Sequence, residues 1–140
     1  MAEILKQIGL QEELGRGVFS SKNAKRAKRS RVPAHVFLEK LGESKISVDR
    51  LSAAPLEEVF TIAERVAAGR GASFYGWAIV IAKRIRENRR EVIATPLPDN
   101  PYHAEILLPE GAAEDREEQQ RHAQELADAS RWQDRPPPGR

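Results

Sequence analysis

The spacing of apolar residues from position 45 to position 69 most constrains the fold, because it changes from a strand period to a helix period. Residues 45–50, KISVDR, alternate between apolar and polar side chains, which predicts a strand with Ile46 and Val48 facing the core. Residues 55–68 follow the helical period, with a proline in the first turn and a glycine after the last. The core-facing stripe of this helix is predicted to comprise Leu56, Val59, Phe60, Ala63, Val66 and Ala67.

Three more strands and a final helix are predicted farther along the chain. Residues 73–81 are rich in aromatic and β-branched side chains, which favours a buried strand, although a helical spacing over 74–88 also fits and the type of that segment stays open. Residues 91–95 and 102–108 are predicted to be the next strands of a meander, joined by the rigid turn PLPDNP. Residues 114–131 are predicted to form a helix whose apolar face carries His122, Ala123, Leu126 and Ala127.

These elements predict an α+β fold with a small, mainly antiparallel sheet, packed by the helix near 55–68 and the helix near 114–131. A chain of 140 residues corresponds to one domain, and a hydrophobic fraction of 40% is enough for a single core. We expect this domain to span residues 33–132. Residues 1–32 are expected to form an N-terminal helix and a basic surface segment, and residues 133–140 a flexible Pro-rich tail.

The segment before the first predicted strand has three parts. Residues 2–14 are predicted to form a short helix that the following GRG sequence ends. Ser20 or Ser21 can cap a short basic helix that has little to bury, so this helix is expected at the surface. Residues 34–42 are predicted to be a short helix or an irregular segment anchored by one valine and one phenylalanine.

The absence of cysteine excludes several chemistries. A chain without cysteine has no disulfide framework, no thiolate nucleophile and no Cys-based metal site, which fits the cytoplasm. The N-terminal residues lack the basic and apolar regions of a signal peptide, and no run approaches the roughly 18 apolar residues of a membrane span. We therefore expect a cytoplasmic protein with no membrane association, and the abundance of Arg and Ala suggests a bacterial source.

Charge is distributed unevenly along the chain. Seven Lys or Arg and no acid lie between Arg16 and Leu38, and a second basic cluster, KRIRENRR, covers residues 83–90, whereas residues 110–125 are mainly acidic. Basic clusters of this kind bind nucleic-acid phosphates, although charge runs also serve only as solvated surface. The residues expected to contact phosphates are Lys22, Lys25, Arg26, Lys28, Arg29, Arg31, Lys83, Arg84, Arg86, Arg89 and Arg90.

The stretch DNPYHAEILLP at positions 99–109 contains the strongest candidate for catalysis. His103 and Glu105 are two residues apart on a predicted strand, so they face the same side of the sheet. A His and a Glu can work as acid and base beside cationic side chains in metal-independent RNA cleavage. The order of a helix followed by antiparallel strands resembles that of the small RNase toxins of the barnase and RelE type. The alternative is an exposed strand face without chemistry.

Other candidate sites are less specific. Asp49 and Arg50 stand at a predicted strand end, where they can serve as a site or as a cap and salt bridge. The two Gly-Arg-Gly segments, 15–17 and 69–71, are too short for a phosphate-binding loop, and no nucleotide-binding motif occurs. The zinc signature of nucleobase deaminases needs two cysteines, which this chain lacks. A metal site of another kind would have to recruit His35 or His122 with carboxylates that the sequence does not place, so we expect no metal and no cofactor.

Three functional hypotheses follow from the sequence. The leading one is a non-enzymatic module that binds the backbone of RNA or DNA, or a nucleoprotein, through the basic clusters. The second is a small metal-independent nuclease that uses His103 and Glu105. The third is a subunit that binds or inhibits a protein partner through its tails and its acidic helix.

Overall fold

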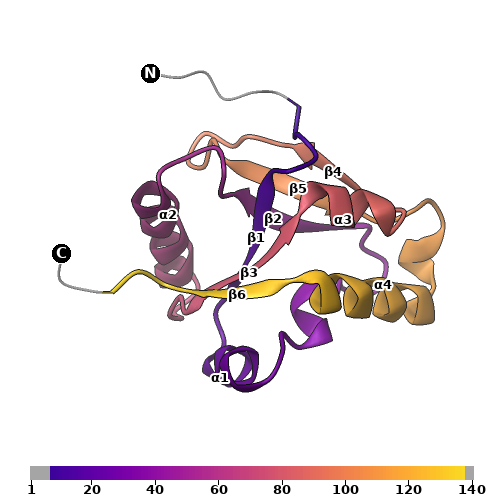
Figure 1. Cartoon of the computed structure of the whole chain (residues 1–140), viewed down its shortest axis with the longest axis horizontal. Helices are drawn as coiled ribbons and strands as arrows, with labels where there is room; N and C mark the ends of the chain where they lie inside the picture. Colours follow the sequence, from indigo (N-terminus) through magenta and orange to yellow (C-terminus); the bar gives the residue numbers. More distant parts are fainter. Residues whose placement is uncertain (1–6, 138–140) are drawn as a thin grey trace.

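The computed structural model describes residues 7–137 and is shown in Figure 1. Within these residues, six antiparallel strands form one sheet in the order β4-β5-β2-β1-β3-β6. The strands are β1 (Glu13–Val18), β2 (Lys45–Arg50), β3 (Gly76–Ile81), β4 (Glu91–Ala94), β5 (His103–Leu107) and β6 (Arg131–Asp134). The α-helices are α1 (Ser21–Arg29), α2 (Leu56–Gly69), α3 (Ala82–Glu87) and α4 (Arg116–Ala129), and the 3-10 helices are η1 (Ala34–Phe37) and η2 (Ala112–Glu114).

The α+β class and the mainly antiparallel sheet predicted from the sequence are confirmed. The predicted strand at 45–50 coincides with β2, and the two predicted helices near 55–68 and 114–131 correspond to α2 and α4. The predicted meander is confirmed only for the hairpin of β4 and β5; its first step is wrong, because β3 pairs with β1 and β6 and not with β4. Two strands that were not predicted, β1 and β6, pair with β3 on its two sides.

The N-terminal segment differs most from the sequence-based prediction. Residues 13 and 14 belong to β1 and not to a helix, and β1 pairs with β3 from Glu13 to Val18. Residues 2–6 of the predicted helix lie outside the described part of the chain. The GRG sequence lies inside the strand because Gly15 has no side chain, which lets the Trp77 ring pack against its backbone. A Cβ at Gly15 would lie 2.8 Å from the Trp77 ring.

Helices cover both faces of the sheet (Figure 1). On one face, α2 packs its buried residues against Phe74, Trp77 and Ile79. On the other face, α1, η1, α3 and α4 share a second core with alternate residues of the strands. Ala24 and Ala27 of α1 belong to this second core, so the basic helix is anchored to the domain although its cations are exposed. No helix among residues 7–137 is long and apolar enough to cross a membrane.

The buried stripe of α2 is rotated relative to the predicted one. Its buried residues are Val59, Ile62, Ala63 and Ala67. Leu56 and Val66, which were predicted to face the core, are 39% and 41% exposed. Leu56 opens the first turn, and Val66 borders an open pocket on the sheet, so neither is covered.

A buried ion pair fastens the segment after η1 to the turn before β4. Glu39 and Arg90 contact each other with both side chains fully buried. Burial raises the pKa of Glu39 and lowers the pKa of Arg90, and each partner's charge opposes the shift. Nearby, Gln119 of α4 donates its amide to the carbonyls of Lys40 and Glu43. The predicted apolar face of α4 is confirmed, including the fully buried His122.

The C-terminal strand β6 follows α4 directly and pairs with β3 from Gly76 to Ile79. The predicted boundary between domain and tail at residue 133 therefore falls inside a strand. Gly76 has a φ of +156°, and a Cβ at this position would lie 2.4 Å from the Gln133 carbonyl oxygen and 2.6 Å from the Trp132 ring. Only glycine fits between the two strands here.

Gly76→Ala should therefore destabilise the fold by about 1–3 kcal/mol, because the added methyl group forces β6 away from β3. Gly69→Ala is the matched control, since nothing lies within 4 Å of a Cβ at this helical position. We expect a lower Tm for the first variant and an equal or higher Tm for the second in thermal unfolding. Equal Tm values for Gly76→Ala and the parent would contradict the β3–β6 pairing.

A second pair of variants checks the orientation of α2. Val59 is fully buried and Val66 is 41% exposed, so the same truncation has different costs at the two positions. Val59→Ala should lower the free energy of unfolding by about 2 kcal/mol, through lost burial and a residual cavity. Val66→Ala should change it by no more than about 0.5 kcal/mol. Denaturant unfolding of both variants measures the difference, and the reverse order would show that the helix is turned the other way.

Candidate functional site

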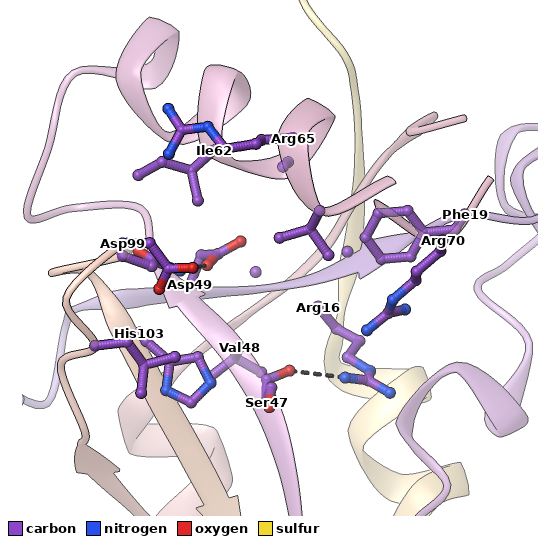
Figure 2. A pocket seen from close by; sticks show the side chains of 16 residues that line it. Arg16, Phe19, Ser47, Val48, Asp49, Ile62, Arg65, Arg70, Asp99 and His103 are labelled. Carbon is purple, nitrogen blue, oxygen red and sulfur yellow. Dashed lines mark hydrogen bonds between the residues drawn. The ribbon is translucent and has the colours of Figure 1, made fainter. Parts of the chain in front are cut away.

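A pocket of about 280 Å³ lies on the α2 face of the sheet. Its walls come from β1, β2, α2 and the turn that leads into β5, and Figure 2 shows the side chains that line it. Asp49, Asp99 and His103 lie toward one end, and Arg16 and Arg70 lie toward the other end. Acidic, basic and titratable groups therefore converge on one hollow, which is the usual arrangement of a ligand-binding or catalytic site.

The pocket reaches into a split between β1 and β2. The ladder between these strands ends after the Gly15–Asp49 pair. Beyond this point, Nη1 of Arg16 donates to the Ser47 carbonyl oxygen at 2.8 Å, a bond marked in Figure 2, and Nε donates to the Val36 carbonyl at 3.0 Å. The guanidinium thus takes the place of backbone pairing and holds the two strands at a fixed separation.

Asp49 is a partly buried carboxylate that is held by two neutral donors. Nδ2 of Asn100 donates to one carboxylate oxygen at 3.0 Å, and Nε1 of Trp77 donates to the other at 3.4 Å. Burial raises the pKa of Asp49, and the two hydrogen bonds and the charges of His103 and Arg16 only partly oppose that shift. Burial therefore favours the protonated form of this carboxyl group, which is the form that can donate a proton.

His103 lies directly across from Asp49 in the β2–β5 ladder. Its Nδ1 is 2.9 Å from the carbonyl oxygen of Thr95 and 2.9 Å from the hydroxyl of the same residue. A carbonyl oxygen only accepts, so Nδ1 carries the proton of the neutral imidazole. The lone pair is then at Nε2, where it is available as an acceptor or a base.

The turn before β5 positions both groups. Asn100 and Leu97 form an isolated antiparallel bridge with hydrogen bonds in both directions, and Oδ1 of Asn100 accepts from the Tyr102 amide at 3.1 Å. Two prolines, at 98 and 101, fix the backbone on both sides of Asp99. The rigid turn predicted from PLPDNP therefore delivers the Asn100 amide to Asp49 and starts β5 at His103.

Three arginines line the pocket and, within residues 7–137, none of them makes an ion pair. They are Arg16 of β1, Arg65 of α2 and Arg70 at the end of α2. Burial lowers the pKa of Arg16, and the charge of Arg70 lowers it further. The guanidinium of Arg70 also lies 4.8 Å from the centre of the Phe19 ring. Two neighbouring cations without a carboxylate partner favour an anionic ligand.

The structure separates the residues of the predicted catalytic pair. His103 and Glu105 are on the same face of β5, with Ala104 and Ile106 buried on the other face. His103 lines the pocket, whereas Glu105 lies outside it, with its carboxylate 3.3 Å from the Lys45 ammonium. Neighbouring positions on one strand face therefore have different surroundings.

Asp49 and Arg50 also have different surroundings, since only one of them lines the pocket. Asp49 lines the pocket, whereas Arg50 is 2% exposed and forms a bidentate ion pair with Glu12, with N–O distances of 2.6 and 2.9 Å. This pair joins the segment before β1 to the end of β2. Arg50 therefore contributes to the fold, in the salt-bridge role that the sequence also allowed.

The two basic clusters have different environments. Six cations of the first cluster are exposed, and the ion pairs between the first cluster and the rest of residues 7–137 are Lys28–Asp134 and Arg31–Asp128. In the second cluster, Arg84 pairs with Glu87, Arg86 with Glu91, and Arg90 with Glu39. Helix α4, which carries most of the acidic segment, packs beside both η1 and α3. We therefore treat the first cluster alone as the candidate nucleic-acid interface.

Sequence reasoning missed the pocket arginines although it singled out the segments that hold them. Arg16 and Arg70 are the central residues of the two Gly-Arg-Gly segments, which were rejected as phosphate loops. Each glycine-flanked arginine comes from a different element, so the sequence gives no sign that they meet. No group of three or more His, Asp or Glu side chains within residues 7–137 is arranged to hold a metal ion.

The raised pKa of Asp49 predicts how stability depends on pH. The folded state holds this proton more tightly than the unfolded chain, whose carboxyl pKa is near 3.8. The resulting stabilisation is fully present below that value and is lost as the pH rises through the native pKa. The difference between the Tm of the parent and the Tm of Asp49→Ala should therefore decrease as the pH rises from about 4 toward neutrality. Thermal unfolding followed by circular dichroism measures both Tm values.

Glu118→Ala provides the control of opposite sign. A hydrogen bond from Arg121 lowers the pKa of Glu118, so the stabilisation it gives is present above the unfolded pKa and is lost as the pH falls. The Tm of the parent relative to this variant should rise over the same pH range. The same sign for both variants would contradict the environment described for Asp49.

Comparison of the chain with family models, with curated proteins and with solved structures finds no match. The geometry of the pocket and of α1 is what points to a function. These two features are close in the chain, because Phe19 lines the pocket and Ser20 caps α1.

Proposed function

We propose that the protein binds the phosphate backbone of nucleic acid through the outer face of α1. The observation that carries this proposal is a stripe of four cations, Lys22, Lys25, Arg26 and Arg29, at helical positions i, i+3, i+4 and i+7. All four are exposed, and none makes an ion pair within residues 7–137. Such a stripe neutralises phosphates and releases their counterions.

The stripe has a fixed position on the domain. Ala24 and Ala27, on the opposite side of the helix, are buried in the core, and the Ser20 hydroxyl accepts from the Asn23 amide at the helix start. Seven residues of helix span about 10 Å, which equals roughly three steps along a nucleic-acid strand at 3.4 Å each. The stripe therefore matches a short length of backbone without needing to order a flexible segment.

The second basic cluster is less suited to this role. Arg90 is buried, Arg86 donates to the Glu91 carboxylate and to the carbonyls of Ile8 and Val92, and Arg84 is paired with Glu87. Arg86 thus ties α3 to β4, Arg90 ties the turn before β4 to the segment after η1, and Arg84 pairs within α3. The proposed interface therefore excludes this cluster. Contacts to phosphates alone imply binding without base readout. The proposal also places the protein in a compartment that holds nucleic acid, such as the cytoplasm.

The test is the salt dependence of binding to mixed-sequence RNA and DNA, measured by fluorescence anisotropy. The triple variant Lys25→Gln, Arg26→Gln, Arg29→Gln removes three phosphate contacts, so the slope of log K against log salt for duplex should become shallower by about 2.7, at roughly 0.9 per contact. Affinity at low salt should fall in parallel. Circular dichroism confirms that the variant remains folded.

Lys83→Gln, Arg84→Gln, Arg89→Gln is the matched control, because it removes the same number of charges from the second cluster. We expect this variant to keep the slope of the parent. Binding that does not depend on salt, or a slope that changes only in the control, would show that α1 is not the interface. Capture of protein partners without nucleic acid would favour the partner-subunit hypothesis.

A further inference from the structure

We propose that the pocket beside α1 cleaves RNA by transesterification, with His103 as the general base and Asp49 as the general acid. This inference rests on the proposed nucleic-acid binding through α1 and names RNA as the substrate class. It also replaces the catalytic pair predicted from the sequence, since Glu105 lies outside the pocket.

The arrangement of Asp49 and His103 supports their roles. The two residues face each other across β2 and β5, so their Cβ atoms are separated by about 5 Å and their functional groups extend into the same hollow. Thr95 fixes the proton of His103 on Nδ1, which leaves the Nε2 lone pair as the base. Asn100 and Trp77 hold the Asp49 carboxyl in one orientation. Both groups are therefore positioned before substrate binds.

The arginines supply the site for the phosphate. Arg16 uses Nε and Nη1 for the carbonyls of Val36 and Ser47, and within residues 7–137 its Nη2 has no hydrogen-bond partner. Arg70 lies near Arg16 and is held over the Phe19 ring. Preorganised cations of this kind stabilise the negative charge that develops on a pentacoordinate phosphorus. The pocket volume of about 280 Å³ lies at the lower end of the roughly 300–1,000 Å³ of small-molecule sites, so the proposed ligand portion is no larger than a sugar-phosphate unit.

The reaction needs no group beyond those in the pocket and the substrate. Nε2 of His103 takes the proton from a ribose 2′-hydroxyl as the 2′ oxygen forms a bond to phosphorus. The bond from phosphorus to the 5′ oxygen breaks, and protonated Asp49 gives its proton to that leaving oxygen. The products are a 2′,3′-cyclic phosphate and a 5′-hydroxyl, and both side chains return to their starting forms by proton exchange with water.

The basic helix leads toward this pocket. Phe19, which lines the pocket, directly precedes the Ser20 cap of α1. Asn23 in the first turn of α1 is 2.7 Å from His35, and the next residue, Val36, accepts the hydrogen bond from Arg16. A strand that follows the cations of α1 toward the helix start therefore reaches the arginine end of the pocket.

Single-turnover cleavage of an end-labelled, single-stranded RNA in the presence of a chelator tests the inference. We expect the parent to yield 2′,3′-cyclic phosphate ends, and to leave DNA of the same sequence intact. His103→Gln and Asp49→Asn should each lower the rate by about a hundredfold or more, with the RNA affinity unchanged. Arg70→Gln should lower it by about tenfold or more.

Glu105→Gln is the matched control for Asp49→Asn, because it makes the same change to a carboxylate outside the pocket. We expect it to retain the parent rate. Equal losses in both variants, or full activity in folded His103→Gln, would overturn the assignment of the two residues. Cleavage of DNA at the same rate as RNA would overturn the 2′-hydroxyl step.

The two proposals fail in different ways. A folded parent that binds RNA with the expected salt slope but leaves it uncleaved at enzyme excess overturns the catalytic inference alone. Cleavage that depends on His103 and Asp49 but has the same KM in the α1 triple variant overturns the proposed interface and leaves the catalytic inference standing. A folded parent that neither binds nor cleaves RNA overturns both proposals.

Discussion

The pairing of β1 between β2 and β3 is the interaction on which the rest of the structure depends. It places a strand with two glycines at the centre of the sheet, and the missing side chain at Gly15 gives the Trp77 ring its place in the α2-side core. The same pairing ends early on the β2 side, after Gly15 and Asp49, because Arg16 donates to the Ser47 carbonyl there. The pocket is thus a consequence of how β1 pairs, and not an addition to a finished sheet.

This arrangement places a carboxylate where solvation is poor. Asp49 is held by the neutral donors of Asn100 and Trp77 and makes no ion pair among the described residues, so its ionised form is disfavoured. Two other carboxylates of low exposure are instead paired with arginines, in Glu12–Arg50 and Glu39–Arg90. A carboxylate without such a partner, in a hollow lined by arginines without carboxylate partners, is typical of a site that awaits a ligand.

The sequence predicted elements whose pattern is local and missed features that depend on pairing. Alternation in KISVDR gave the bounds of β2, and the helical period gave α2 and α4, since each pattern records which side chains are buried. The start of β1 was predicted as the end of a helix, because a glycine in the sequence indicates either the end of an element or a close packing contact with the backbone. Only Trp77, more than sixty residues away, distinguishes these two cases at Gly15. The candidate site follows the same rule: the spacing of His103 and Glu105 gave their shared face, but the register that sets Asp49 opposite His103 is long-range.

The two proposed sites lie on different faces of the sheet. The cations of α1 point away from the core in which Ala24 and Ala27 anchor the helix. The pocket opens on the α2 face, and the link between the two regions is the short path from Asn23 through η1 to Arg16. If both proposals hold, Arg16 is the residue at which a strand bound by α1 would first meet the pocket. Its two hydrogen bonds to backbone carbonyls hold the guanidinium in place without a ligand, so the arginine end of the pocket is preorganised.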